Sequence, residues 1–342
     1  MISAIQSELK QRSSELKEDV DTIYFGGGTP SLLNDIEISR LINTIHKYYV
    51  VSENVEITLE ANPDDLDQDK LEQLIECGIN RLSIGIQSFS NDLLYQMNRS
   101  HSSQQAIEAI QFAQDSGFEN ISIDLMFGLP DLSDSLWMDT LAKVIILEVQ
   151  HVSCYNLTVE ENTALWHHVN KNQTSIPAIQ NQENQFFNAH DFLESHGFFH
   201  YEISNFSKEG FKSKHNSNYW NRTAYLGTGP SAHSFIDKTR RWNISNNTKY
   251  LQGIHSGETY SSIEILTDKD QFNEMLMLGL RTSKGVNKSD LERFLYYDDK
   301  EFIAKRDKLL EDKILIDNGP NLTLSKNSFF LCDFYSSELF AV

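Results

Sequence analysis

Apolar residues in the first half of the chain follow two patterns that alternate along the sequence. One is the spacing of about three to four residues that is typical of an amphipathic helix, as in Ile2, Ile5 and Leu9, and the other is the short apolar run of a buried strand. The patterns predict strands at 22–25, 55–59, 81–86, 121–125 and 151–157, and helices at 2–16, 36–48, 71–76, 104–115 and 135–147. Strands separated by such helices indicate an α/β fold with a parallel sheet, which binds ligands at the carboxyl ends of its strands.

The pattern changes after Leu157 and again near residue 267. The middle of the chain predicts a loop with a polar tract, a helix, and an aromatic-rich series of short strands and turns, at 166–177, 180–196 and 198–242. Helices at 271–280, 289–294 and 302–310 then precede a hairpin at 314–324 with an Asn318-Gly319 turn. This order is similar to a winged-helix module, so we expect three regions, at 1–160, 161–266 and 267–342.

Four of the predicted strands end in residues that are suited to hold a ligand. Gly26, Gly27 and Gly28 follow the strand at 22–25 and leave backbone N–H groups open to close approach. The next three strands end in a polar residue each: Glu60, Gln87 and Asp124. We expect these residues to face one pocket, because the carboxyl ends of parallel strands meet at one edge. The alternatives are a tight strand-to-helix turn at the glycines and side chains that bond to loop backbone.

Composition narrows the classes of function. The 29 basic and 49 acidic residues give a formal net charge of −20, which argues against a surface that follows nucleic-acid phosphates, so no nucleic-acid partner is expected. No apolar run is long enough to span a bilayer and residues 1–18 lack a signal-peptide core, so the chain is expected to be cytoplasmic. Cys77, Cys154 and Cys332 lie far apart and are expected to be small apolar residues rather than metal ligands.

At the glycine triplet and the polar strand ends the chain resembles the radical S-adenosylmethionine superfamily, in the branch of HemW-type haem chaperones and oxygen-independent coproporphyrinogen III oxidases. The similarity extends from Ile2 to the C-terminus. It implies a partial (β/α)6 barrel with a C-terminal helical, winged-helix-like domain, and S-adenosylmethionine as a cofactor. The segment with Gly27, Gly28 and Thr29 matches the one that receives the methionine amino group, and Glu60 matches the residue that contacts the nucleoside. Further cofactor contacts are implied for Gln87, Arg99 and Asp124, although Arg99 would equally suit a solvated helix end.

Within this branch the segment from Tyr201 to Ser234 is more similar to the HemW type. It contains the runs 201–206, 215–220 and 227–234, and the second of these reads His215-Asn216-Ser217-Asn218-Tyr219-Trp220. In the family this His-Asn-x-x-Tyr-Trp run is implicated in haem handling, and neutral imidazole is a usual ligand of haem iron. The resemblance therefore implies His215, Tyr219 and Trp220 as haem candidates, with His233 as a second histidine. The alternatives are a hydrogen-bonded structural histidine and ordinary packing aromatics.

The chain departs from the family in one respect. The family binds a 4Fe-4S cluster through three cysteines spaced C-x3-C-x2-C on the loop after the first barrel strand, and this spacing does not occur here. By resemblance the chain starts on the first helix, so the first strand and the cluster loop are expected to be missing, and Thr22 to Phe25 should form an exposed sheet edge. Without three thiolates, no cluster and no reductive cleavage of the cofactor are expected.

The resemblance implies a haem chaperone that binds haem and transfers it to acceptor haemoproteins. The alternatives are an oxygen-independent coproporphyrinogen III oxidase of porphyrin biosynthesis and an inactive truncated fragment. Whether the chain is an enzyme stays open, because the oxidase chemistry requires the cluster. A homodimer and peripheral membrane contact also stay open.

Overall fold

The computed structural model describes residues 1–342, and its main feature is a seven-stranded sheet with the strand order β1-β2-β3-β4-β5-β7-β6. The strands are β1 (Val20–Phe25), β2 (Val51–Ala61), β3 (Arg81–Gln87), β4 (Ile121–Phe127), β5 (His151–Asn156), β6 (Phe199–Glu202) and β7 (Asn205–Ser207). Strands β2 to β5 run parallel, whereas β7 and β6 are added antiparallel. The five predicted strands and the parallel sheet are confirmed, and β1 lies at a sheet edge.

Helices follow the strands in the predicted alternation. They are α1 (Ile2–Gln11), α2 (Asp35–Tyr48), α3 (Gln68–Glu76), α4 (Asn91–Gln96), α5 (Ser103–Asp115), α6 (Asp134–Ile146) and α8 (Ile179–Ser195), with short 3-10 turns at Pro30–Leu32 and Pro63–Asp65. Capping boxes fix where two of them start: Asn34 and Glu37 satisfy each other's backbone N–H groups at α2, and Ser102 and Gln105 do so at α5.

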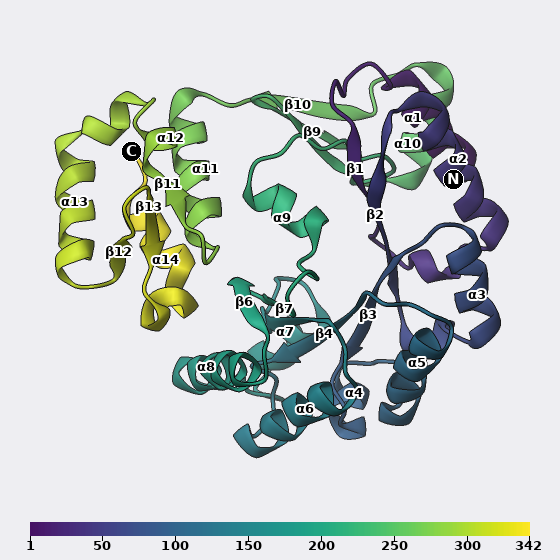
Figure 1. Ribbon diagram of the computed structural model, residues 1–342, viewed down its shortest axis with the longest axis horizontal. Helices are drawn as coiled ribbons and strands as arrows, with labels where there is room; N and C mark the ends of the chain where they lie inside the picture. The colour runs from purple at the N-terminus through teal and green to yellow at the C-terminus, as the bar shows by residue number, and fades with distance from the viewer. The chain divides into compact units, whose positions relative to one another are not determined.

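Apolar and polar residues alternate along much of strands β2 to β5. Leu59, Leu82, Ile84, Ile123 and Val152 are completely buried, and the residues between them are mostly polar. Successive side chains of a strand point to opposite faces, so the sheet has one apolar and one polar face. The amphipathic helices α3, α5 and α6 lie along one side of β3 and β4 (Figure 1) and bury their own apolar stripe there. The polar face is therefore available to contact a ligand.

The chain divides into two compact units. The terminal unit comprises 1–23, 34–56 and 213–342, and the central unit comprises 24–33 and 57–212. Strands β1 and β2 begin in the terminal unit and end in the central unit, so the carboxyl ends of β1 to β5 all belong to the central unit. The sequence boundaries expected at 160 and 266 stay predictions.

The terminal unit contains a three-stranded antiparallel sheet in the order β10-β9-β8, with β8 (His233–Ile236), β9 (Thr239–Asn243) and β10 (Ser261–Ile265), and α10 (Asn247–Ser256) follows β9. The prediction of only strands and turns at 198–242 is wrong at α9 (Lys214–Trp220), which is a helix. Ser213 explains the difference, because its hydroxyl accepts the N–H of Asn216 at 3.1 Å and caps the first turn.

A buried carboxylate joins α1 to the loop before β8. Glu8 is completely buried and accepts hydrogen bonds from Gly229 N at 2.9 Å, Tyr250 Oη at 2.6 Å and Asn243 Nδ2 at 2.8 Å. Arg12, which is 3% exposed, completes the set at 3.0 Å. A buried charge is tolerated when it is paired and hydrogen-bonded in this way, so the network fixes the Gly227–Ser234 loop.

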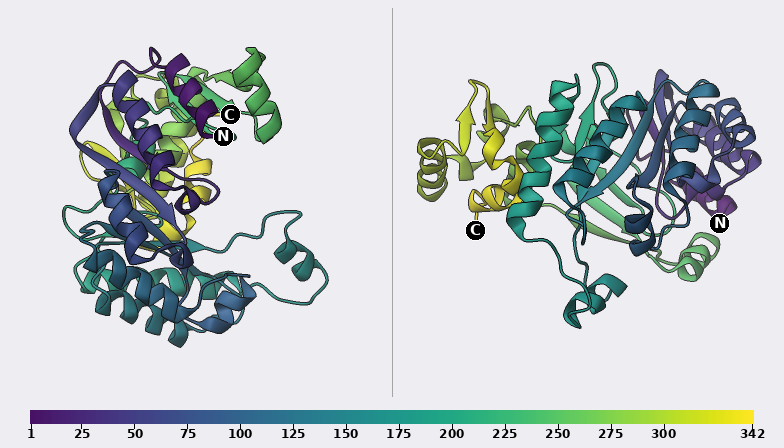
Figure 2. Two further views of the ribbon diagram at one scale, coloured as in Figure 1. Left: turned by 90° about the vertical axis from the view of Figure 1, so that its right-hand side faces the viewer. Right: turned by 90° about the horizontal axis from the view of Figure 1, so that it is seen from below.

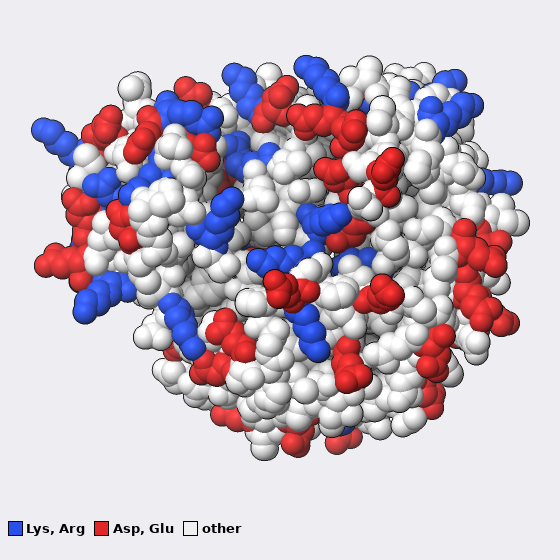
Figure 3. Space-filling model, viewed as in Figure 1, with Lys and Arg blue, Asp and Glu red and all other residues white.

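The last 75 residues have the predicted winged-helix-like order. They form α11 (Asp268–Leu280), β11 (Val286–Asn287), α12 (Lys288–Leu291), α13 (Lys300–Glu311), β12 (Leu315–Asp317), β13 (Asn321–Leu324) and α14 (Cys332–Glu338), with 3-10 turns at Leu295–Asp298 and Lys326–Leu331. The strands pair in the order β11-β13-β12, and Gly319 turns the hairpin with a φ of 80°. On the face shown in Figure 3, acidic and basic side chains are interspersed over this segment.

One segment of the central unit projects away from its sheet. The predicted loop at 166–177 is wrong in its first part, because residues up to 170 belong to α7 (Ala164–Asn170), which Thr163 caps by accepting the N–H of Trp166 at 3.2 Å. No residue of α7 is buried, and Figure 2 shows the segment extending outward. Neither α7 nor any other helix of the chain has the length and apolar character needed to cross a membrane.

Candidate functional site: the strand ends and helix α9

The ends of β1 and β2 meet at Glu60. Gly27 N donates to Glu60 Oε2 at 3.2 Å, and the Tyr24 hydroxyl donates to Glu60 Oε1 at 2.8 Å. Gly27 and Gly28 have φ values of 74° and 72°, which favour glycine, and a Cβ added at either would meet no atom within 4 Å. The two glycines therefore border open space next to a carboxylate. Gly27 and Glu60, which the sequence predicts to be neighbours, are brought together.

The end of β3 brings Gln87 and Arg99 together around Gly85. A Cβ added at Gly85 would lie 3.0 Å from Gln87 Nε2 and 3.4 Å from Arg99 Nη2. Arg99 Nη2 donates to Asn62 Oδ1 at 2.8 Å and to the Gly85 carbonyl at 3.1 Å, while its buried Nε has no partner. Gln87 has a φ of 64° and follows a shift in the pairing register, and this backbone conformation is costly for a residue other than glycine. Strained backbone of this kind is concentrated at functional sites.

Asp124 adds a second carboxylate to this edge of the sheet. The pKa of its carboxyl is raised to about 6. Desolvation is the largest cause and the nearby charge of Glu60 adds to it, whereas hydrogen bonds from Ser153 and Ser83 and the charge of Arg81 oppose the shift. The Ser83 hydroxyl lies 3.3 Å from both Asp124 carboxylate oxygens. Desolvation, followed by the Glu60 charge, also raises the pKa of Tyr24 far above its usual range. Two carboxylates whose charges interact favour a cationic ligand.

We call Gly27, Glu60, Gln87, Arg99 and Asp124 the strand-end cluster. The side chain of Thr29 joins none of these residues, and Thr29 precedes the 3-10 turn Pro30–Leu32 without capping it. Sequence reasoning missed two residues that hold the cluster in place, Tyr24 and Asn62. Tyr24 directly precedes Phe25 and the glycines, and Asn62 follows Glu60 by two residues, so the position of each relative to the strand end was the available signal.

Helix α9, in the terminal unit, carries three of the four predicted haem candidates. His215 Nδ1 lies 3.0 Å from Thr22 Oγ1, and His215 Nε2 lies 2.9 Å from the Tyr219 hydroxyl. The rings of His215 and Tyr219 meet edge to face at a centroid distance of 4.9 Å, as expected for residues four apart on a helix. The guanidinium of Arg281 lies 5.7 Å from the centre of the Trp220 ring. No residue of α9 is buried.

The backbone of α9 is anchored by the buried carboxylate of Glu56. Glu56, on β2, is 6% exposed, and its two oxygens accept the N–H groups of Lys214 at 3.0 Å and His215 at 2.9 Å. These are first-turn N–H groups with no partner inside the helix, and a negative charge is favourable at this end of a helix. Sequence reasoning missed Glu56, because it precedes the helix by more than 150 residues.

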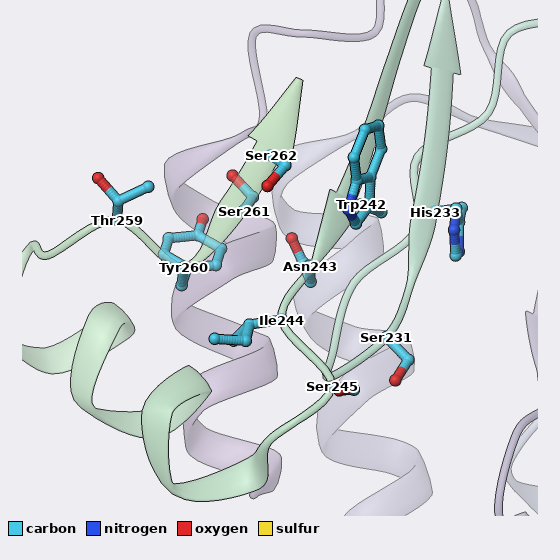
Figure 4. Close-up of a pocket in the computed structure, with 10 residues that line it drawn as sticks. All are labelled: Ser231, His233, Trp242, Asn243, Ile244, Ser245, Thr259, Tyr260, Ser261 and Ser262. Atoms are coloured by element: carbon cyan, nitrogen blue, oxygen red, sulfur yellow. The ribbon is translucent and has the colours of Figure 1, made fainter. Parts of the chain in front are cut away.

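His233, the fourth candidate, has a different setting. It starts β8 opposite Trp242 of β9, its ring makes no hydrogen bond, and it lines a pocket of about 430 Å³ together with Trp242, Asn243 and Tyr260 (Figure 4). The remaining lining residues are Ser231, Ile244, Ser245, Thr259, Ser261 and Ser262, so no Asp, Glu, Lys or Arg side chain contributes. The structure thus places His215 and His233 on separate elements with no contact between their rings.

Comparison with known proteins identifies the family. The family model described as the radical SAM superfamily matches residues 3–144. The chain is 36% identical to the heme chaperone HemW of Bacillus subtilis over 84% of its own length and 76% of that protein. It is 31% identical to the heme chaperone HemW of Lactococcus lactis over 96% of its length and 86% of that protein. The chain belongs to the HemW family of radical SAM proteins.

The fold of this HemW-family chain is similar to that of coproporphyrinogen III oxidase (HemN) from Escherichia coli. The TM-score is 0.82, and the likeness covers 99% of this chain and 82% of that one. The identity is 20%, so this comparison shows the fold alone. It confirms the predicted partial barrel of α/β class.

HemW-family and other radical SAM proteins are typified by S-adenosylmethionine and a 4Fe-4S cluster, and the residues of this chain fit the two groups differently. The open space beside Gly27 and Gly28, the two carboxylates and the unpaired Nε of Arg99 suit a ligand with an ammonium, a sulfonium and a carboxylate group. The cysteines do not suit a cluster. Cys77 ends α3, Cys154 lies on β5 and Cys332 starts α14, and no three histidine, cysteine or acidic residues are placed to hold a metal ion.

The environment of two of the cysteines also opposes metal binding. Desolvation raises the pKa of Cys332 to about 12 and raises that of Cys154 further. Both thiols are therefore held in the protonated form, whereas a metal ligand must be a thiolate. This agrees with the expectation that Cys154 and Cys332 are packed side chains.

Proposed function

We propose that this HemW-family chain binds haem, with His215 as the iron ligand, and passes the haem to acceptor haemoproteins. Two relatives named heme chaperone HemW, at 36% and 31% identity over most of the chain, support the proposal. The observation that carries it is helix α9. It holds the imidazole of His215 edge to face with the ring of Tyr219, and no residue of the helix is buried.

The chemistry of α9 suits a macrocycle that contains iron. A neutral imidazole donates a nitrogen lone pair to iron, and a hydrogen bond at its other nitrogen fixes the ring and increases its basicity. Thr22 supplies such a partner at Nδ1, so Nε2 would be the nitrogen for iron, in exchange for its hydrogen bond with Tyr219. Tyr219, which is 38% exposed, offers a flat ring beside that nitrogen. A haem bound here would be accessible to a second protein, as delivery requires.

We also propose that the strand-end cluster binds S-adenosylmethionine. When bound, this group supplies a sulfonium centre together with a nucleoside and an amino acid. Glu60 and Asp124 place negative charge where the ammonium and the sulfonium need it, and the unpaired N–H of Arg99 can donate to the carboxylate. Gly27, Gly28 and Thr29 border the open side, and Gln87 closes the end of β3.

A haemin titration tests the haem proposal. Adding haemin to the full chain should give a Soret band, and His215→Ala should weaken or shift it. His233→Ala is the matched control, because it removes an imidazole from the same unit without touching α9. A band that is unchanged in His215→Ala but lost in His233→Ala would move the site to the pocket at β8, and absence of any band would reject haem binding.

Delivery is tested by mixing the haem-loaded chain with an apo-haemoprotein such as apomyoglobin. Transfer should move the Soret band to that of the acceptor, at a rate faster than release of haem into buffer that contains only a haem scavenger such as albumin. Equal rates in the two mixtures would show that the chain releases haem passively and does not deliver it.

A further inference from the structure

Both ring nitrogens of His215 are occupied before any ligand arrives. Nδ1 meets the hydroxyl of Thr22 at 3.0 Å, and Nε2 meets the hydroxyl of Tyr219 at 2.9 Å. A phenol is a better hydrogen-bond donor than an alcohol, so the arrangement favours donation from Tyr219 to Nε2 and from the Nδ1–H group to Thr22. In this tautomer the lone pair that iron needs lies on Nε2 and is covered by Tyr219.

The rest of the imidazole surroundings hold the ring still. The N–H of His215 is bound by Glu56 at 2.9 Å, and the neighbouring N–H of Lys214 is bound by the same carboxylate at 3.0 Å. Glu56 belongs to the seven-stranded sheet and is 6% exposed, so it is a fixed point for the first turn of α9. The backbone of His215 and its Nδ1 side are therefore set by strands β1 and β2, whereas the Nε2 side is covered by Tyr219, which is 38% exposed.

We infer that Tyr219 is a cap on the iron-binding nitrogen of His215, and that Thr22 and Glu56 are the positioning residues that keep this nitrogen in place when the cap leaves. The inference rests on the proposed haem site at His215. On binding, the Nε2 lone pair forms a coordinate bond to iron and the hydrogen bond from the Tyr219 hydroxyl breaks. No proton is lost from the ring and no oxidation state changes. The resting protein thus keeps the imidazole closed until haem competes with one hydrogen bond.

The cap is tested by removing one oxygen atom. Tyr219→Phe keeps the ring that meets His215 and Tyr225 and deletes only the hydroxyl. A single hydrogen bond of this kind is worth about 2- to 10-fold in an equilibrium constant. We expect haemin to bind about 2- to 10-fold more tightly to Tyr219→Phe, chiefly through a faster association rate in stopped-flow absorbance, with the Soret maximum unchanged. Tyr225→Phe is the matched control and should bind as the unmodified chain does.

The positioning residues are tested in the opposite direction. Thr22→Val removes the partner of Nδ1 and should weaken haemin binding by about 2- to 10-fold and displace the Soret maximum, because the imidazole loses its tautomer preference and some basicity. Thr22→Ser keeps the hydroxyl and should restore both values. Glu56→Gln should weaken binding in the same direction. A loss of stability alone would lower the midpoint of thermal unfolding without moving the Soret maximum, so the spectrum separates the two effects.

The outcomes distinguish this inference from the haem proposal itself. If the unmodified chain gives no Soret band, the haem proposal fails. If the band depends on His215 but Tyr219→Phe binds as Tyr225→Phe does, haem binds there and the cap is rejected. Weaker binding by Tyr219→Phe would also reject the cap, because it would make the hydroxyl a contact to the bound haem. A band that survives in His215→Ala would reject both the cap and its positioning residues.

Discussion

The strand-end cluster and helix α9 are prepared for their ligands in opposite ways. At the strand ends, hydrogen-bonding capacity is left unmet: Arg99 Nε is buried without a partner, and Gly27 and Gly28 border open space. At α9 the capacity is met from within, because Thr22 and Tyr219 occupy both nitrogens of His215. A ligand at the strand ends would bond to groups that have no partner, whereas a ligand at α9 would replace a hydrogen bond that the protein already makes. A site of the first kind depends on rigid backbone, and one of the second kind depends on side chains that move.

The largest effect is expected at Gly26, whose backbone lies close to the side chains of Tyr24 and Glu60. A Cβ there would lie 2.6 Å from Tyr24 Cε1 and 3.0 Å from Glu60 Oε1, so Gly26→Val should displace the tyrosine or the carboxylate. We expect a loss of about 3 kcal/mol in the free energy of unfolding, measured by urea denaturation, and a loss of S-adenosylmethionine binding, measured by calorimetry. The clash can be verified by adding Tyr24→Ser, which should recover part of the loss in a double-mutant cycle. Simple additivity would contradict the proposed contact.

The raised pKa of Asp124 makes the stability of the strand-end cluster depend on pH. The folded-state pKa of about 6 exceeds the usual 3.8, so the stabilising contribution of the protonated carboxyl is fully present below the lower value and is lost as pH rises through the higher one. The free energy of unfolding of the chain, relative to Asp124→Asn, should therefore fall by about 2 kcal/mol between about pH 4 and pH 7. Parallel pH curves for the two proteins in urea denaturation would show that Asp124 is not desolvated.

A smaller effect on ligand binding is expected from Glu60. Its carboxylate is the acceptor that β1 and β2 share, and Glu60→Ala should weaken S-adenosylmethionine binding by about 1–2 kcal/mol, the value of a charge-assisted hydrogen bond. Calorimetric titration of the full chain measures it. Glu53→Ala, on the exposed part of β2, removes the same charge away from the cluster and should leave binding unchanged. Equal losses of binding in the two variants would show that Glu60 acts only through its long-range charge and not through a contact with the ligand.

The smallest effect is expected at the paired histidines of α7. His167 and His168 are exposed and lie outside both sites. His167→Ala and His168→Ala should change the free energy of unfolding by less than about 0.5 kcal/mol and leave the haemin Soret band as it is. A weaker band in either variant would mean that an exposed imidazole suffices for binding, and that the special environment of His215 is not needed.

The sequence predicted the strand ends well because a strand and the residue that ends it are local features. The alternation in Arg81-Leu82-Ser83-Ile84 or Ile121-Ser122-Ile123-Asp124 identifies both the strand and its polar face. Helix α9 was missed because Asn and aromatic residues are weak helix formers, and the helix depends on a Ser213 cap and on Glu56. The contact between Thr22 and His215 joins residues 193 apart. No local sequence pattern indicates such a pair. The contacts at the two ring nitrogens of His215 could therefore be found only from the three-dimensional structure.

The segment around α7 is exposed to cleavage by proteases. It projects from the central unit without burying a single residue of its helix, so a protease meets it before it meets any packed element. A cut there would separate β5 from β7 along the sequence but not in the sheet, where His151, Val152 and Ser153 pair with Ser207, Phe206 and Asn205. The nicked protein would then run as two bands on a denaturing gel while keeping its native mass in solution. We therefore expect the pairing of β5 with β7 to hold the two fragments together without the covalent link between them.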